Sequence, residues 1–207
     1  MATTVRKAIE ADIDFIAKSI LATSRDEKKI GLFDLIFNSS DDSVVVDGIK
    51  KLLNTKAKSH IHISNFLVSA IGTTTVGAIC GYEARLSSDE KLAGALSEIG
   101  IDESYHERIA VYFLCAPTTD NQTYVLDFLY TLPEHKSLDA YRSLVAKAVL
   151  NAKLRGYHKI QLSLDVGSNA QELIYKKLGF SVVDDKKSEY YEAVFGHSGI
   201  ERLQMSI

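Results

Sequence analysis

Apolar positions are densest between residues 124 and 180, where their spacing predicts a strand, a helix, a second strand and a second helix. YVLDFLYTLP is apolar and aromatic and stops at Pro133, which lacks the N–H that a central strand needs. Residues 138–154 repeat apolar side chains at helical spacing and end before Gly156, a helix stop. HKIQLSL alternates like a strand, and QELIYKKLG predicts a helix closed by Gly179. This order predicts a right-handed crossover between two parallel strands.

The pattern before residue 85 predicts three helices and a β-hairpin behind a short first strand at residues 3–8. The hairpin covers residues 61–84 and turns at Gly72, and the glycines inside its second strand, Gly77 and Gly81, predict a bulge or a close approach of backbone. The second and third helices are expected at residues 32–37 and 42–55. The first is amphipathic, with one apolar face of five aliphatic residues: Ile9, Ile13, Ile16, Ile20 and Leu21.

Residues 86–121 predict two further helices, the second ended by Pro117, and they stand between the third and fourth strands as an insertion. After residue 180 the chain predicts a strand tail at SVVDD, an aromatic cluster and a final strand, IERLQMSI. The cluster consists of Tyr190, Tyr191 and Phe195.

Composition narrows the class of protein without choosing a function. The 207 residues are 46% hydrophobic and carry a net charge of −3, which predicts one globular domain over residues 1–207 and no nucleic-acid or membrane partner. Cys80 and Cys115 each lie in an apolar run and are expected to be buried thiols. No apolar run approaches the roughly 20 residues of a membrane span and no secretory leader is evident, so a cytoplasmic location is expected.

Three segments of the 124–180 region resemble the motifs of the GNAT acetyltransferase superfamily. Residues 131–133 (TLP) stand at the family's V-x-P, residues 136–141 (KSLDAY) at its phosphate loop R-x-x-G-x-G/A, and residues 168–180 at N-x-x-A-x-x-L-Y-x-x-x-G-F. The resemblance implies an α/β fold with a mixed, strongly curved sheet, helices on both faces and the helical insertion at 86–121. It also implies an acyltransferase that moves an acetyl group from acetyl-CoA to a primary amine of a small molecule or of a protein lysine.

Two residues match the family's catalytic positions. Tyr175 stands where a family tyrosine protonates the departing thiolate, and a phenol with a pKa near 10 suits that task. Asp127 lies six residues before Pro133, where many family members carry the base, and it is the single acid in an apolar run. Each has a simpler alternative, because Tyr175 fits as a packing tyrosine and Asp127 as a hydrogen-bonded structural acid.

The resemblance also marks residues for holding acetyl-CoA. They lie on the strand that stops at Pro133, on the phosphate loop and at the start of the helix that Gly179 closes: Leu129, Thr131, Lys136, Ser137, Asp139, Ala140, Tyr141, Ser168 and Asn169. Lys136 keeps a positive charge where the family has Arg or Gln, whereas Asp139 and Tyr141 replace glycine or alanine. A carboxylate beside a diphosphate is repulsive, by on the order of a kcal/mol when partly desolvated. This departure leaves an alternative open, a GNAT-fold binding or regulatory protein without turnover.

The insertion has two interpretations. It is a helical pair that extends the core or forms a homodimer contact, or it is a lid or wall that selects the acceptor. A separate alternative for the whole protein is an interaction module whose insertion, residues 86–121, forms the working surface. No metal site is predicted, because His60 and His62 alternate in SHIHIS without a cysteine or carboxylate at ligand spacing.

Overall fold

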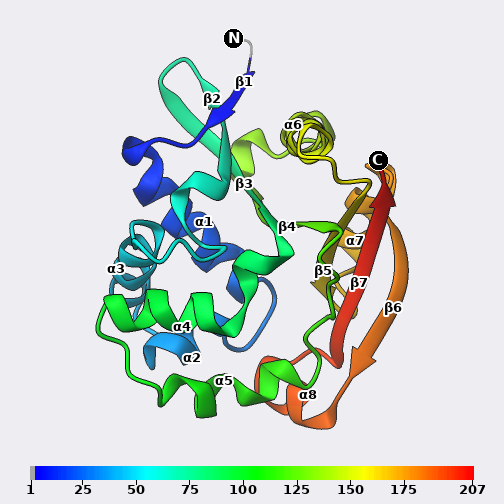
Figure 1. Ribbon diagram of the computed structural model, residues 1–207. Helices are drawn as coiled ribbons and strands as arrows, with labels where there is room; N and C mark the ends of the chain where they lie inside the picture. Colours follow the sequence, from blue (N-terminus) through cyan, green and yellow to red (C-terminus); the bar gives the residue numbers. More distant parts are fainter. Residues whose placement is uncertain (1–2) are drawn as a thin grey trace.

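The computed structural model describes residues 3–207, with the side chain of Leu138 outside the description. It contains a seven-stranded sheet of order β1-β2-β3-β4-β5-β7-β6 (Figure 1). β4 and β5 run parallel, and every other neighbouring pair is antiparallel. The strands are β1 (Thr3–Lys7), β2 (Phe66–Ile71), β3 (Thr74–Glu83), β4 (Thr123–Thr131), β5 (Lys159–Asp165), β6 (Ser181–Lys187) and β7 (Gly199–Ser206). The predicted mixed sheet and its parallel pair are therefore confirmed.

The hairpin of β2 and β3 is shorter at its start than predicted. Residues 63–65 form a 3₁₀ turn, and β2 begins only at Phe66. The side chain of Asn65 holds the preceding loop by donating to the carbonyl oxygens of Ser59 and His60, at 3.1 and 3.0 Å. The expectation that His60 and His62 alternate on a strand is therefore wrong, because this loop diverts the chain before the sheet begins.

One face of the sheet is covered by α1 (Ile13–Arg25) and α3 (Asp42–Leu53), with α2 (Leu32–Phe37) beside them. The first helix begins later than its apolar pattern suggests. Ile9 is extended and 55% exposed, and it precedes a 3₁₀ turn at Glu10–Asp12. The Asp12 carboxylate accepts the Ile9 N–H at 2.9 Å and pairs with Arg6 at 2.6 Å, which fixes this turn ahead of the helix.

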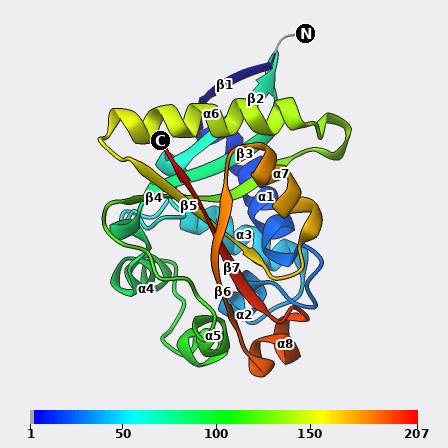
Figure 2. The same cartoon turned by 90° about the vertical axis from the view of Figure 1, so that its right-hand side faces the viewer.

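The opposite face carries α6 (Leu138–Leu154), which crosses the sheet over β1 to β4 (Figure 2). Ser137 caps this helix by accepting the Ala140 N–H at 3.1 Å. α7 (Asn169–Lys177) follows β5, and Tyr175 on this helix and Leu178 just after it pack into the apolar cluster between α6 and the sheet. Gly156 and Gly179 stand just beyond these two helices with positive φ of +84° and +102°, so both predicted helix stops are confirmed.

The insertion consists of α4 (Asp89–Glu98) and α5 (Tyr105–Phe113), as predicted, and Ser88 caps α4. α5 contacts α2 on one side and α8 (Glu189–Phe195) on the other, at the end of the molecule away from α6 (Figures 1 and 2). The sequence pattern missed α8, because its aromatic side chains were interpreted only as a cluster. Within that cluster Tyr191 and Phe195 are buried, whereas Tyr190 is 75% exposed.

Two sequence expectations about the sheet interior are confirmed. A Cβ at Gly77 would lie 2.5 Å from Ser69 Oγ, and one at Gly81 would lie 2.9 Å from the Tyr124 ring, so both glycines permit close approach. Both cysteines are buried and unpaired. Within residues 3–207 there is also no helix with the length and apolarity of a bilayer span.

Candidate active site

β4 and β5 separate soon after they meet, and this separation creates the site. Their pairing runs from Thr123 opposite Lys159 to Val125 opposite Gln161. Over the rest of the two strands, up to Thr131 and Asp165, residues 3–207 show no pairing between them. The edge of β4 that faces β5 is therefore open beyond Val125, and its backbone groups are available to a ligand.

A bulge in β4 accompanies the separation. The register with β3 shifts between Cys80 opposite Asp127 and Ala78 opposite Tyr130, and Phe128 has φ +50°. Such a conformation costs about 1–3 kcal/mol in a non-glycine residue and is kept where its surroundings enforce it. Here Asp127 Oδ1 accepts the Phe128 N–H at 2.8 Å, which holds the peptide in this orientation.

The bulge places two successive side chains on the same face of the sheet. Asp127 pairs with Cys80 and lines a cavity on the face that carries α1 and α2. Phe128 lines the same cavity and packs against Phe33 and Phe66, with ring centroids 6.0 and 6.4 Å away. In a regular strand one of the two would point to the α6 face instead.

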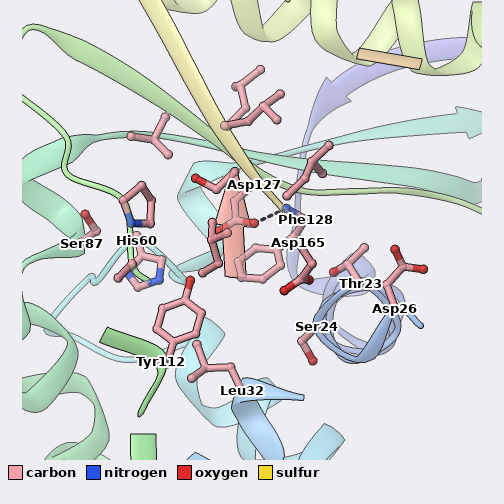
Figure 3. A pocket seen from close by; sticks show the side chains of 18 of the residues that line it. Thr23, Ser24, Asp26, Leu32, His60, Ser87, Tyr112, Asp127, Phe128 and Asp165 are labelled. Atoms are coloured by element: carbon pink, nitrogen blue, oxygen red, sulfur yellow. Dashed lines mark hydrogen bonds between the residues drawn. The ribbon is translucent and has the colours of Figure 1, made fainter. Parts of the chain in front are cut away.

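The cavity has a volume of about 450 Å³, which suits a small-molecule ligand. Its walls come from α1, α2, the loop at residues 60–61, the insertion, β4, β5 and α7. Figure 3 shows Asp127, His60 and Tyr112 pointing into this space from three separate parts of the chain.

Asp127 is the acid that β4 contributes to the cavity. Burial raises its pKa to about 6, against the opposing effects of the Phe128 N–H and the charge of Lys28. Lys28 does not pair with it, because its ammonium is 2.7 Å from Asp165. No cation within residues 3–207 forms an ion pair with Asp127, so this carboxylate is ionised at neutral pH without a protein counter-charge.

Tyr175 reaches the cavity from α7, on the far side of the gap between β4 and β5. Its ring packs edge-on against Phe180 at 5.7 Å. Burial, and then the charge of Asp127, raise the pKa of its phenol above the usual value. Tyr175 is therefore a neutral hydrogen-bond donor at pH 7, and the two predicted catalytic residues lie on one cavity.

Three further polar groups line the cavity that sequence reasoning had not assigned to it: His60, Tyr82 and Tyr112. The His60 ring lies 5.1 Å from the Tyr82 ring, and burial lowers the pKa of its imidazole to about 4. Its Nδ1 is buried without a hydrogen-bond partner. These residues come from a loop, a strand and the insertion, so no local motif in the sequence could have joined them.

The residues predicted to hold acetyl-CoA divide between two places. Leu129 and Ser168 line the cavity with Asp127 and Tyr175. A second hollow of about 340 Å³ lies at the start of α6 and is lined by five others: Thr131, Lys136, Ser137, Asp139 and Ala140. Tyr141 is buried beside them, and Asn169 is the first residue of α7.

The departures from the phosphate-loop motif are arranged so that they leave the loop accessible. The Asp139 side chain is 88% exposed and pairs with Arg142 at 2.6 Å, which offsets its charge. Tyr141 is directed into the protein and is only 8% exposed. Tyr141 therefore leaves the loop open, whereas Asp139 keeps a carboxylate at the hollow beside an exposed ion pair.

A set of polar contacts closes the cavity between α1 and β5. Lys28 binds Asp165, whose other oxygen accepts the Tyr191 hydroxyl at 2.6 Å. One residue beyond the end of α1, Asp26 accepts from Gln171 of α7 at 2.5 Å. The contacts of Lys28 with Asp165 and of Asp26 with Gln171 each join residues more than 130 positions apart and fix the width of the gap.

No protein-family model and no curated protein sequence matches this chain. Solved structures do match it along its whole length. An N-acetyltransferase from Staphylococcus aureus Mu50 is 17% identical over 99% of this chain and 100% of its own, with a TM-score of 0.67. A GCN5-related N-acetyltransferase from Kribbella flavida is 15% identical over 100% and 98%, with a TM-score of 0.62.

A third match, a putative acetyltransferase from Salmonella typhimurium with its cofactor acetyl-CoA, is 16% identical over 100% of this chain and 94% of its own, with a TM-score of 0.53. The splayed parallel pair and its flanking helices thus define an α/β acetyltransferase-type architecture. The particular fold is that of the GNAT N-acetyltransferases, as the sequence motifs predicted.

Proposed function

We propose that the protein transfers an acetyl group from acetyl-CoA to a primary amine. The observation that supports this most directly is the position of Asp127 and Tyr175. They lie on opposite sides of the gap between β4 and β5 and face one cavity, one as an ionised acid and the other as a neutral phenol. The fold shared with acetyltransferases gives the same expectation.

In the proposed reaction the ammonium group of the acceptor gives one proton to Asp127, and the free nitrogen attacks the thioester carbonyl carbon. A C–N bond forms, the C–S bond breaks, and the departing sulfur takes the phenolic proton of Tyr175. The remaining excess proton on nitrogen restores the phenol. The net products are the amide, the CoA thiol and one proton, which Asp127 releases to solvent.

The chain offers places for both ends of acetyl-CoA. The open edge of β4 presents its backbone groups beside Leu129 and the cavity, where the pantetheine and acetyl end would lie. The start of α6, a 17-residue helix, presents the positive end of its dipole together with Lys136, where the pyrophosphate would lie.

The first test measures acetyl-CoA binding by calorimetry and thiol release in the presence of simple primary amines. The variant is Tyr175→Phe, which keeps the ring and removes the proton. We expect kcat to fall by ~10²- to 10⁴-fold while the affinity for acetyl-CoA stays the same. Tyr190→Phe is the matched control, because this tyrosine is 75% exposed and lies outside the cavity.

Failure to bind acetyl-CoA would overturn the proposal in favour of a binding or regulatory protein. If Asp139→Gly then restores binding, the altered phosphate loop is the reason for the failure. If acetyl-CoA binds and Tyr175→Phe retains full kcat, acetyl transfer stands but the acid is another group.

A further inference from the structure

Within the helical insertion, α5 is bound to α2 by one arginine, whereas α4 is held separately by Glu98, which accepts the N–H groups of Lys56 and Ala57. Arg108, in α5, donates from Nε to the Leu35 carbonyl oxygen at 2.7 Å and from Nη2 to that of Ile36 at 3.0 Å. These carbonyls belong to the last turn of α2, where helical oxygens have no partner within the helix. Its Nη1 also donates to Ser104 Oγ at 2.7 Å. One guanidinium therefore fixes α5 against α2.

Tyr112 lies one helical turn after Arg108 and reaches the cavity (Figure 3). Its ring packs against Tyr191 and Phe195, with centroid distances of 6.4 and 6.3 Å. Burial raises the pKa of its phenol above the usual value, so the hydroxyl stays neutral. Within residues 3–207 this hydroxyl has no hydrogen-bond partner, which leaves it available to a ligand.

Asp127 offers a cation a partner next to the tyrosines of the cavity, because its charge acts on Tyr82 and Tyr112. It lacks a counter-charge, whereas Asp165 is already paired with Lys28. A buried carboxylate gains most from a single partner that brings the opposite charge and hydrogen-bond donors.

Beside this acid the cavity is aromatic. Phe33, Phe128 and Tyr82 form its walls together with Tyr112, and Ile109 of α5 lies next to them. Flat apolar groups pack favourably against such rings, and an ammonium group gains from their faces. Polymethylene chains that carry further charges lose hydration against these walls without compensation.

We propose that the acceptor is a compact primary amine carried on an aromatic body, and that Tyr112, positioned by Arg108, selects it. This inference rests on the proposed acetyl transfer and makes it specific. The ammonium group lies toward Asp127, and the ring lies among the aromatic walls. The insertion is then the wall that selects the acceptor, and polyamines and protein lysines are poor substrates.

The test compares three acceptors at saturating acetyl-CoA: 2-phenylethylamine, spermidine and an Nα-acetylated lysine amide. We expect kcat/KM for 2-phenylethylamine to exceed the other two by at least about tenfold. Binding of each amine to the protein in the presence of free CoA, measured by calorimetry, gives a second readout that does not depend on turnover.

Tyr112→Leu should raise KM for 2-phenylethylamine by about two- to tenfold, the range expected for loss of an aromatic pair, with kcat within twofold. KM for propylamine, which has no ring, should hardly change. Tyr190→Leu, on the exposed side of α8, is the matched control and should alter neither KM nor kcat for 2-phenylethylamine. Arg108→Gln should reproduce the Tyr112→Leu pattern without weakening acetyl-CoA binding, and Arg108→Lys should recover part of the preference, because it still donates to one carbonyl.

The outcomes separate the two proposals. Turnover with spermidine or the lysine amide equal to that with 2-phenylethylamine overturns this inference and leaves acetyl transfer standing. An equal change in KM for 2-phenylethylamine and for propylamine in Tyr112→Leu also overturns it. If 2-phenylethylamine binds more tightly than spermidine and the lysine amide but no amine is acetylated, the proposed acetyl transfer fails and the cavity's preference for aromatic amines stands.

Discussion

Replacing Asp127 by asparagine should stabilise the protein at neutral pH while it abolishes the base. The side chains have the same shape, and the asparagine Oδ1 can still accept the Phe128 N–H that holds the bulge. The substitution removes the negative charge of the Asp127 carboxylate, which has no counter-ion in the cavity. The expected result is a variant that is more stable and less active, which is the opposite of ordinary damage to a core.

The magnitude follows from the pKa. A carboxyl group whose pKa moves from 3.8 in the unfolded chain to about 6 in the folded one binds its proton more tightly when folded. Its contribution to the free energy of unfolding is therefore largest below pH 4 and declines as the pH rises from about 4 to about 6. The full decline corresponds to about 3 kcal/mol, and water inside the cavity reduces the expected effect to about 1–3 kcal/mol.

The assay is urea unfolding of wild type and Asp127→Asn at pH 4 and pH 7.5. The stability difference between the two proteins should grow in favour of the variant by about 1–3 kcal/mol across this interval, and the thermal midpoint at pH 7.5 should rise by roughly 3–10 °C. Asp47→Asn, at an exposed position outside the cavity, serves as control. A difference that is the same at both pH values would refute the reasoning, because it would mean that Asp127 titrates normally.

Two further predictions concern the helices that hold the site. Arg25→Ala should lower the free energy of unfolding in urea by about 3–5 kcal/mol. Arg25 is bound to the buried Asp34 at 2.8 Å and to Asp42 at 2.5 Å, so the variant leaves Asp34 without its cation. A loss of stability no larger than that of an exposed ion pair would contradict this. Gly48→Ala should destabilise the protein by about 1–3 kcal/mol, because the new Cβ would lie 2.5 Å from the Phe37 ring. This loss occurs although alanine is more favourable than glycine in a helix by about 1 kcal/mol. Phe37→Leu combined with Gly48→Ala should relieve the clash and recover that stabilisation.

The sequence predicted most of the fold because the pattern of each element is local. β4, α6, β5 and α7 each have their own spacing and stop signal, and the stops at Gly156 and Gly179 need only one residue in a left-handed conformation. The element that was missed, α8, carries aromatic side chains that were interpreted only as a cluster before the last strand. The first helix was started too early because Ile9 continues the apolar period, whereas Asp12 and its hydrogen bonds end the extended segment later.

The site was only partly predictable, for a different reason. Asp127 and Tyr175 were found through motifs along the chain, and the structure places both on one cavity. His60, Tyr82 and Tyr112 carry no such signal, because a loop, a strand and an insertion meet only after folding. The bulge was equally hidden, since phenylalanine at position 128 gives no hint of the positive φ that is usual for glycine.

Three unfavourable local features lie around this one cavity. Phe128 has a strained backbone, Asp127 is ionised without a counter-charge, and His60 has a buried nitrogen without a partner. Each alone is an ordinary exception, but natural proteins concentrate such exceptions where a ligand or a reaction compensates for them. An amine that pairs with Asp127 would compensate its charge. The bulge is what brings this acid and the aromatic wall to the same face, so its strain is the structural condition for the chemistry proposed here.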